Sequence, residues 1–251
     1  MRALRLLALS LATVLVCAAS GSVASASARH HGHVTCHGGT IHAGTYGSLR
    51  ITGLCTLPDS GTVRVRHGIT VAAHGALNAA TPATLNVAGD VVVEHRGIAA
   101  IGCSPDVGCA ALGSDRIGGN LRAFRAWAVI VHGTTIGGNA TITGGGRTQD
   151  CTAVAVYGGP FYSVVEDSTV GGNVEIRGLH SCWLGVIRNH VGGTVRLIGN
   201  RFGDPDAMEI VTNHIGGNLA CFNNNPAAQV GDSMGQANVV AGQKRGECKT
   251  A

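Results

Sequence analysis

Charged and aromatic side chains are both scarce in this chain of 251 residues. Only 13% of the residues are charged and 4% are aromatic, whereas 45% are hydrophobic. That hydrophobic share excludes a disordered chain, which would be poor in apolar residues and rich in charge. Lysine occurs only as Lys244 and Lys249, and no basic run alternates with aromatic residues. We therefore expect no nucleic-acid partner.

Long apolar runs are also lacking, except close to the start of the sequence. There, Arg2 and Arg5 precede an apolar run over residues 6–18, and Ala26-Ser27-Ala28 follows as a small-x-small sequence. This order is typical of a cleaved signal peptide, so we predict a signal peptide over 1–28 and a secreted, extracellular mature chain. Crossing a bilayer takes roughly 20 apolar residues. No later run is that long, and we expect no transmembrane span in the mature chain.

Glycine, in contrast, is abundant, with 39 residues. A glycine inside a helix costs roughly 1 kcal/mol relative to alanine, so this composition disfavours a helical bundle. Many glycines among small apolar residues favour a tightly wound β-structure with frequent turns. The length is sufficient for one domain with a substantial core.

The cysteines indicate a disulfide framework. Nine are present, and eight remain if Cys17 leaves with the signal peptide. An even number in an exported protein is typical of disulfide pairing. Because only neighbours along the axis touch in a repeat structure, we predict sequential pairs: Cys36 with Cys55, Cys103 with Cys109, Cys151 with Cys182, and Cys221 with Cys248. A zinc site is the alternative, but its short paired spacings are absent.

One short unit recurs along the chain: an aliphatic residue, two glycines, a small polar residue and a further apolar residue. It occurs as Ile117-Gly118-Gly119-Asn120-Leu121, Ile136-Gly137-Gly138-Asn139-Ala140, Val170-Gly171-Gly172-Asn173-Val174, Val191-Gly192-Gly193-Thr194-Val195 and Ile215-Gly216-Gly217-Asn218-Leu219. The first glycines lie 19, 34, 21 and 24 residues apart. All but the long interval suit one coil of a solenoid. The long interval indicates an insertion or an extra short coil.

Positions outside the glycines repeat as well. A small polar residue, which favours a turn, stands two positions before each aliphatic residue: Asp115, Thr134, Ser168, Asn189 and Asn213. Apolar and polar residues alternate after the glycines, which predicts half-buried strands, and an apolar segment before each turn predicts at least one more strand per coil. Stacked coils pair like strands in parallel around one core.

We therefore predict an all-β, single-domain parallel β-helix, or β-solenoid. A histidine-rich N-terminal cap is expected over 29–45, the solenoid over 46–225, and a C-terminal cap or tail over 226–251. Disulfides are expected to tie both caps, because a solenoid must close its core at each end.

The Gly-Gly-Asn turns, the segment 213–221, the run Asn223-Asn224-Asn225-Pro226 and the late Cys248 resemble a family of small exported bacterial β-solenoid proteins of unknown function. The resemblance covers most of the mature chain. It implies a right-handed parallel β-helix and an extracytoplasmic location, and it implies no activity.

Candidate catalytic residues are few. Polysaccharide lyases and hydrolases on parallel β-helices need clustered carboxylates, and pairs of carboxylates can catalyse glycoside hydrolysis. The closest groups in the sequence are Glu166-Asp167 and Asp204-Pro205-Asp206. Solvated turn residues are the other reading of these acids. The expected solenoid contains no lysine to act as the base of a lyase.

Candidate metal ligands are histidines. His190 and His214 occupy the same repeat position, one coil apart, and stacked side chains or a shared metal are both consistent with this. Cleavage after Ala28 would leave Arg29-His30-His31 as the new terminus, whose nitrogens suit copper(II) or nickel(II). A poorly ordered polar tail is the alternative. Because zinc sites use three or four ligands, we predict no metal and no cofactor.

These observations favour an exported, non-catalytic structural or binding β-solenoid that associates with cell-wall glycan or a surface protein. The alternative is a carbohydrate-active enzyme, a polysaccharide lyase or hydrolase, on the same fold. Fold alone supports that alternative, and a fold does not imply a function.

Overall fold

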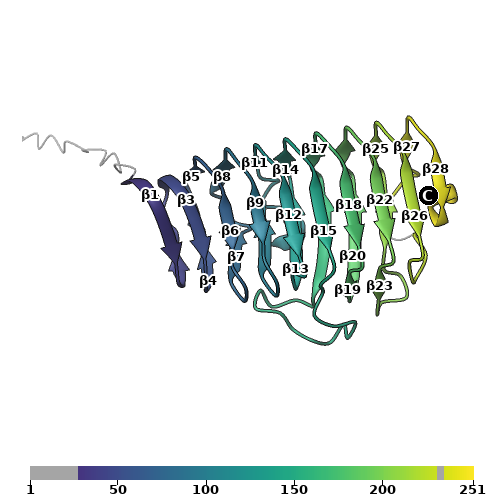
Figure 1. Cartoon of the computed structure of the whole chain (residues 1–251), viewed down its shortest axis with the longest axis horizontal. Helices are drawn as coiled ribbons and strands as arrows, with labels where there is room; N and C mark the ends of the chain where they lie inside the picture. Colours follow the sequence, from purple (N-terminus) through teal and green to yellow (C-terminus); the bar gives the residue numbers. More distant parts are fainter. Residues whose placement is uncertain (1–27, 231–234) are drawn as a thin grey trace, which may run out of the picture.

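The computed structural model describes residues 28–230 and 235–251, together with the side chains from residue 32 onward. The predicted signal peptide lies almost wholly outside the described residues. The chain forms an elongated stack of coils, and the stack runs from β1 at one end to β28 at the other (Figure 1). Nearly all regular structure is β, as predicted. Among the described residues, no helix is long and apolar enough to cross a membrane.

Each complete coil contains three strands, one more than the minimum expected from the sequence. The first strands are β5 (Thr62–Val65), β8 (Thr84–Val87), β11 (Asp115–Ile117), β14 (Thr134–Ile136), β17 (Thr169–Val170), β21 (His190–Val191), β25 (His214–Ile215) and β27 (Val239–Val240). The second strands are β6 (Ile69–Val71), β9 (Val91–Val93), β12 (Leu121–Phe124), β15 (Ala140–Thr143), β18 (Val174–Arg177), β22 (Val195–Ile198), β26 (Leu219–Phe222) and β28 (Lys244–Gly246). The third strands are β2 (Gly39–Thr40), β4 (Leu54–Thr56), β7 (Ala76–Ala79), β10 (Ile98–Ile101), β13 (Ala128–His132), β16 (Tyr162–Glu166), β20 (Trp183–Ile187) and β24 (Glu209–Val211).

Like strands pair in parallel from coil to coil. The first and second strands form one continuous sheet, into which the long strands β1 (Ala28–Cys36) and β3 (Gly44–Ile51) also pair, and the third strands form an eight-stranded sheet. Two short strands, β19 (His180–Ser181) and β23 (Arg201–Phe202), make a separate pair. Parallel pairing extends beyond the expected 46–225 at both ends, since β1 pairs with β3 and β28 pairs with β26.

Three bends close each coil. We call them the first corner, between the first and second strands; the second corner, between the second and third strands; and the third corner, from the third strand to the next coil. Inward-facing aliphatic residues such as Ile117, Leu121 and Val129 are fully buried in one continuous core. Each fully buried side chain of this kind stabilises the fold by roughly 1.5–3 kcal/mol.

The Gly-Gly-Asn unit forms the first corner. The Asn139 backbone N–H donates to Asn120 Oδ1 at 2.9 Å, and the Asn173 N–H donates to Asn139 Oδ1 at 2.8 Å. This ladder begins at Asp90 and ends at the Gln243 N–H. A Cβ on the first glycine of a unit would clash with the coil before it; at Gly137 it would lie 2.4 Å from Gly118 O. The repeated glycines therefore permit the close stacking that the ladder needs.

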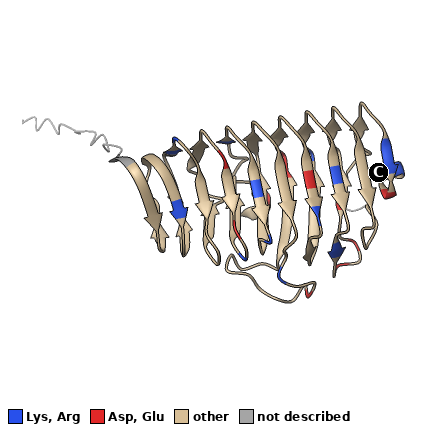
Figure 2. Ribbon diagram, in the orientation of Figure 1, with Lys and Arg blue, Asp and Glu red and all other residues tan. Residues whose placement is uncertain are grey.

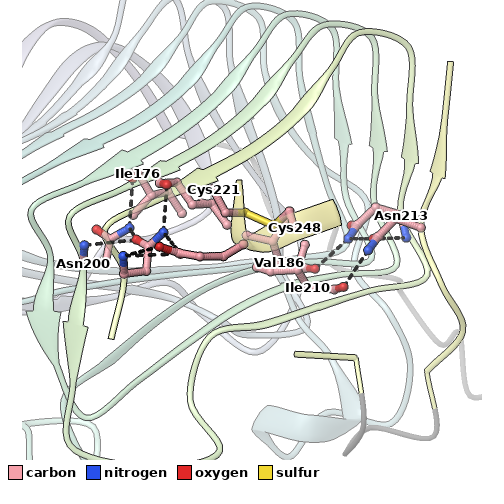
Figure 3. The surroundings of a disulfide bond; sticks show 11 residues. Ile176, Val186, Asn200, Ile210, Asn213, Cys221 and Cys248 are labelled. Atoms are coloured by element: carbon pink, nitrogen blue, oxygen red, sulfur yellow. Dashed lines mark hydrogen bonds between the residues drawn. A yellow bond between two sulfur atoms is a disulfide. The ribbon is translucent and has the colours of Figure 1, made fainter. Parts of the chain in front are cut away.

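A second ladder is buried at the third corner and contains the small polar residues noted in the sequence. Asn213 accepts from the Asn189 N–H at 2.9 Å and donates through Nδ2 to Val186 O at 2.7 Å (Figure 3). The side chains from Asp115 to Asn238 in this ladder are 0–4% exposed. Ser168, Asn189 and Asn213 lie between strands, as their turn preference predicts, whereas Asp115 and Thr134 are the first residues of β11 and β14. The ladder side chains also bond to buried backbone groups, which would destabilise the fold if they were left unpaired. Asn200 and Asn224 form a shorter ladder at the second corner, which ends at Glu247.

All four predicted disulfides are confirmed: Cys36–Cys55, Cys103–Cys109, Cys151–Cys182 and Cys221–Cys248. The first joins the opening coil to the next, and the last ties β26 to the helical turn η2 (Glu247–Thr250) between two asparagine ladders (Figure 3). Disulfides therefore tie both ends of the stack.

Two loops leave the stack and fold back over the outer face of the third strands. Residues 102–114 contain the turn η1 (Pro105–Val107) and the short disulfide. Residues 144–161 account for the long 34-residue interval, and Cys151–Cys182 fastens them to the next coil. The interval is thus an insertion, which protrudes below the stack in Figure 1, and not an extra coil.

Candidate functional site

Glu166 and Asp167, the first predicted acidic pair, lie at the third corner, where β16 ends. Arg188 holds both of them: its Nε donates to Asp167 Oδ1 at 2.7 Å, and its Nη2 donates to Asp167 Oδ2 at 2.9 Å. The same Nη2 also donates to Glu166 Oε1. Parallel register explains this arrangement, because Glu166 pairs with Ile187 and the next residues of the two coils are then neighbours.

Two further residues complete this charge cluster. His132 stands beside Glu166 in the register, with Nδ1 at 3.4 Å from Glu166 Oε2. Asp106 reaches the cluster from the disulfide-closed loop, with Oδ2 at 3.7 Å from Arg188 Nη2. Three carboxyl groups therefore surround one guanidinium. We call Asp106, His132, Glu166, Asp167 and Arg188 the corner cluster.

Burial sets the protonation of the corner cluster. It raises the pKa of Glu166 to about 7, an effect that Arg188 opposes and that the carboxylates of Asp106 and Asp167 reinforce. Burial also lowers the pKa of His132, whose side chain is 3% exposed. Although the His132–Glu166 distance is that of an ion pair, both shifts favour the neutral forms, and neither ring nitrogen of His132 makes a hydrogen bond in the described part of the chain. We regard the contact as one between neutral groups.

The corner cluster links a loop to the solenoid through side-chain contacts. Asp106, His132 and Glu166 are near enough to one another to ligate a metal ion. However, Arg188 already supplies the positive charge to both carboxylates. Glu166 is only 7% exposed and His132 only 2%, so little of either side chain is open to solvent. The arrangement fastens the 102–114 loop to the solenoid.

A pocket of about 360 Å³ lies next to the corner cluster, between the two loops. Asp106, Val107, Ile130, Tyr157 and Tyr162 line it, but Glu166 and His132 do not. Two hydrophobic clusters under the loops contain Ala100, Ile130 and Val164 in one and Ile98 and Phe161 in the other. The loops thus cover an apolar outer face of the third strands.

Asp204 and Asp206, the second predicted pair, lie in the loop between β23 and β24, at the opposite end of the third strands from Glu166. The Asp206 N–H donates to Asp204 Oδ1 at 2.9 Å, as in a side-chain-supported turn. Asp204 lies near Cys151 and Cys182, but those sulfurs are joined in a disulfide. The structure does not bring the two acidic pairs together.

His190 and His214 stack as expected, with ring centroids 4.9 Å apart and an interplanar angle of 4°. Both are exposed on the outer face of the first strands, and the next residues in the column are Thr169 and Val239. These neighbours supply no third nitrogen or carboxylate. The side chains of His30 and His31 lie outside the described part of the structure, and the metal hypothesis for the terminus stays a prediction.

A groove of about 680 Å³ lies at the second corner and was not predicted from the sequence. Three arginines and two histidines, all exposed, line it together with half-buried Trp127: Arg96, Arg125, Arg147, His95 and His180. Gly144, Gly145, Gly146 and Gly178 leave its floor free of side chains, and Thr148 and Gln149 complete the wall. Among the described residues, no carboxylate lines it. We call it the basic groove.

Aromatic rings hold Arg147 over the basic groove. Its guanidinium carbon lies 4.8 Å from the Trp127 ring centroid and 5.2 Å from that of Phe161. Trp127 is itself fixed edge-to-face against Phe161 and His74, at centroid distances of 5.9 and 5.8 Å. Cation–π contacts of this kind hold a guanidinium without using its N–H donors.

The sequence carried part of the signal for these sites. Aligning the repeats on the polar ladder puts His132, Glu166 and Ile187 in one column and Asp167 beside Arg188. Four of the five residues of the corner cluster could therefore be placed together from the repeat. Asp106 and Arg147 carry no such signal, since both lie in loops whose course depends on tertiary contacts.

Comparisons of this chain with protein-family models, with curated proteins and with solved structures found no match.

Proposed function

We propose that this protein is an exported, non-catalytic β-solenoid that binds glycan along its side, in association with a cell wall. The observation that carries the proposal is the basic groove, an open site of about 680 Å³ in which polar and charged side chains surround Trp127. A groove lined by charge of one sign attracts ligands of the opposite charge, and an aromatic ring beside it offers an apolar surface with a polar edge. A rigid stack of coils presents such a groove without rearrangement.

Export is part of the proposal. The basic and apolar start of the sequence and the four disulfides support it, because disulfides persist in oxidising compartments. The Gly-Gly-Asn turns support placing the chain among small exported bacterial β-solenoid proteins. N-terminal sequencing of the secreted protein tests the predicted cleavage after Ala28, and a first residue other than Arg29 contradicts it.

The test of function is co-sedimentation of the purified protein with isolated cell walls and with insoluble polysaccharides, while released reducing or unsaturated ends are assayed in the same tubes. We expect the protein to pellet without releasing sugar. Failure to pellet with any of these materials contradicts glycan binding and directs attention to a protein partner.

A carbohydrate-active enzyme is the second candidate. The observation that favours it is Glu166, a carboxyl group whose pKa is raised to about 7 beside a pocket that contains Asp106. General acids have such a pKa. Sugar release that is abolished in Glu166→Gln but retained in Asp204→Asn would support this candidate and displace the first.

A further inference from the structure

The basic groove gathers positive charge that the protein itself does not neutralise. Elsewhere, arginines of the second strands pair with acids: Arg50 with Glu94, Arg122 with Asp90 and Arg177 with Glu175. Arg96, Arg125 and Arg147 form no ion pair with any carboxylate in the described part of the chain. Like charges in one groove repel one another and raise the local potential. An anion that entered the groove would relieve this repulsion.

Arg96 and Arg125 stand at positions where the backbone conformation would be less strained with glycine. Arg96 and Arg125 have φ values of 61° and 49°, in the left-handed region. The position of Arg125 in the stack is taken by Gly144, Gly178 and Gly199 in the following coils, all with positive φ. A non-glycine residue costs roughly 1–2 kcal/mol in this region. Such outliers cluster at functional sites.

One donor of the basic groove, Arg147, is held in place before any ligand binds. Arg147 rests on Trp127 and Phe161, and Phe161 is buried. Arg147 makes no hydrogen bond or ion pair in the described part of the chain, so its N–H donors are free for a ligand. Planar guanidinium groups bind carboxylate and phosphate oxygens in pairs. A preorganised donor loses less conformational entropy on binding.

The basic groove also follows the axis of the stack. Its lining comes from the corners after β9, β12, β15 and β18, which are four successive coils. Coils are about 4.8 Å apart, so these corners span about 14 Å. A site of this length suits several units of a polymer more than one small anion.

We infer that the basic groove binds an acidic polysaccharide, with Arg96, Arg125 and Arg147 contacting carboxylate or phosphate groups of successive units. The inference rests on the proposed glycan-binding function and names its substrate class. The shared chemistry is a sugar or polyol chain with regularly spaced anionic oxygens.

The experiment compares two triple variants of the full chain. Arg96→Gln/Arg125→Gln/Arg147→Gln removes the arginines of the groove. Arg64→Gln/Arg66→Gln/Arg116→Gln is the matched control, since these three arginines are also exposed and unpaired but lie on or next to the first strands. Both variants lose three charges. Circular dichroism and thermal unfolding establish that each is folded.

Binding is measured by calorimetry with sodium polygalacturonate, with a polyglycerol phosphate and with a neutral glucan. We expect the groove variant to bind the acidic polymers at least about ten-fold more weakly than the unmodified protein, because three charge-assisted contacts are lost together. The control should change by less than about three-fold, through long-range charge alone. Tighter binding of polygalacturonate identifies carboxylate as the group that is bound, and tighter binding of polyglycerol phosphate identifies phosphate. Either result supports the inference.

Three results would overturn it. Equal weakening in both triple variants would show that bulk charge alone attracts the polymer. Equal affinity for single-stranded DNA would show an unselective polyanion surface. Binding to the neutral glucan that both triple variants retain would contradict the inference and leave the proposed glycan-binding function standing, whereas absence of binding to every glycan would remove both.

Discussion

The second and third corners of the solenoid use arginine in opposite ways. At the third corner, Arg188 contacts three carboxyl groups and is satisfied within the protein. At the second corner, Arg96, Arg125 and Arg147 line one open groove, and none of them has an acidic partner among the described residues. In both places, arginines stand at positive φ, where a glycine would be less strained. The same local backbone thus supports one internal clasp and one open site.

The comparison teaches how to tell structural charge from functional charge in a repeat fold. Charged groups are few and dispersed over the coils, so each local grouping stands out (Figure 2). Where opposite charges meet below the surface, they position loops. Where charges of one sign gather in an open groove, they remain available to a ligand.

The largest expected effect is at the corner cluster. Arg188→Ala should lower the free energy of unfolding by about 3 kcal/mol, because it leaves a largely buried carboxyl group and two neighbouring acids without their cation. Arg147→Ala should cost less than about 1 kcal/mol, the worth of its contact with the rings. Urea unfolding measures both. Similar losses of unfolding free energy in the two variants would contradict the view that only the arginine of the third corner supports the fold.

The pH dependence of stability should come from the third corner. The folded-state pKa of Glu166, about 7, lies above its ordinary value of 4.5. Its contribution to stability is therefore complete below about pH 4.5 and is lost as the pH rises to about 7. The lowered pKa of His132 acts in the opposite sense, and its contribution is lost as the pH falls below 6.5.

The variant Glu166→Gln separates these two effects. Between pH 4.5 and pH 7.5, the unmodified protein should lose stability relative to Glu166→Gln by on the order of 2 kcal/mol. Glu175→Gln, at a half-buried residue on the second strands, is the control: it keeps Glu166 and should lose stability over this range as the unmodified protein does. Thermal unfolding across this pH range is the measurement, and parallel curves for the unmodified protein and Glu166→Gln would contradict the assignment.

One carboxyl group of the third corner has no cationic partner in the described part of the chain. Burial raises the pKa of Asp115 to about 6, and its Oδ2 is buried without a hydrogen bond, although Oδ1 accepts from the Leu85 N–H at 2.8 Å. Asp115→Asn should therefore increase stability by about 1 kcal/mol above pH 6 and lose this advantage below pH 4. A destabilised variant at pH 8 would show that the carboxylate is needed in its charged form.

The smallest expected effect is at Arg125. Arg125→Gly should raise stability by about 0.5–1 kcal/mol, because glycine adopts positive φ without strain. The same substitution should weaken binding of acidic polysaccharide. Arg196→Gly, in the middle of β22, is the control and should lose stability. A loss of stability in Arg125→Gly would mean that the arginine side chain itself supports the corner.

Sequence reasoning predicted the repeat, the parallel pairing and all four disulfides, because each depends on contacts between neighbours along the axis. Residues such as Asn189 and Asn213 were predicted as turn formers, and their burial became apparent only in the folded stack. Glu166 was identified as a candidate but without Asp106, whose loop is positioned by tertiary packing. The basic groove depends on Trp127 and Phe161 receiving Arg147 from an insertion, and periodicity carries no information about an insertion.

The asparagine ladders repeat the same kind of hydrogen bond between neighbouring coils, so the bonds within the ladder do not depend on the number of coils. At the first corner each side chain accepts from the coil that follows, whereas at the buried third corner each accepts from the coil that precedes it. At the first corner, each coil from Asn120 to Asn218 therefore donates one such bond and accepts another. A different residue stands at an end, such as Glu247 after Asn224 at the second corner. A gene that duplicated or deleted one such coil would encode a longer or shorter rod with its bonding unchanged. Length is thus a property that this fold can vary in evolution without rebuilding its interior, while the open groove at its side is retained.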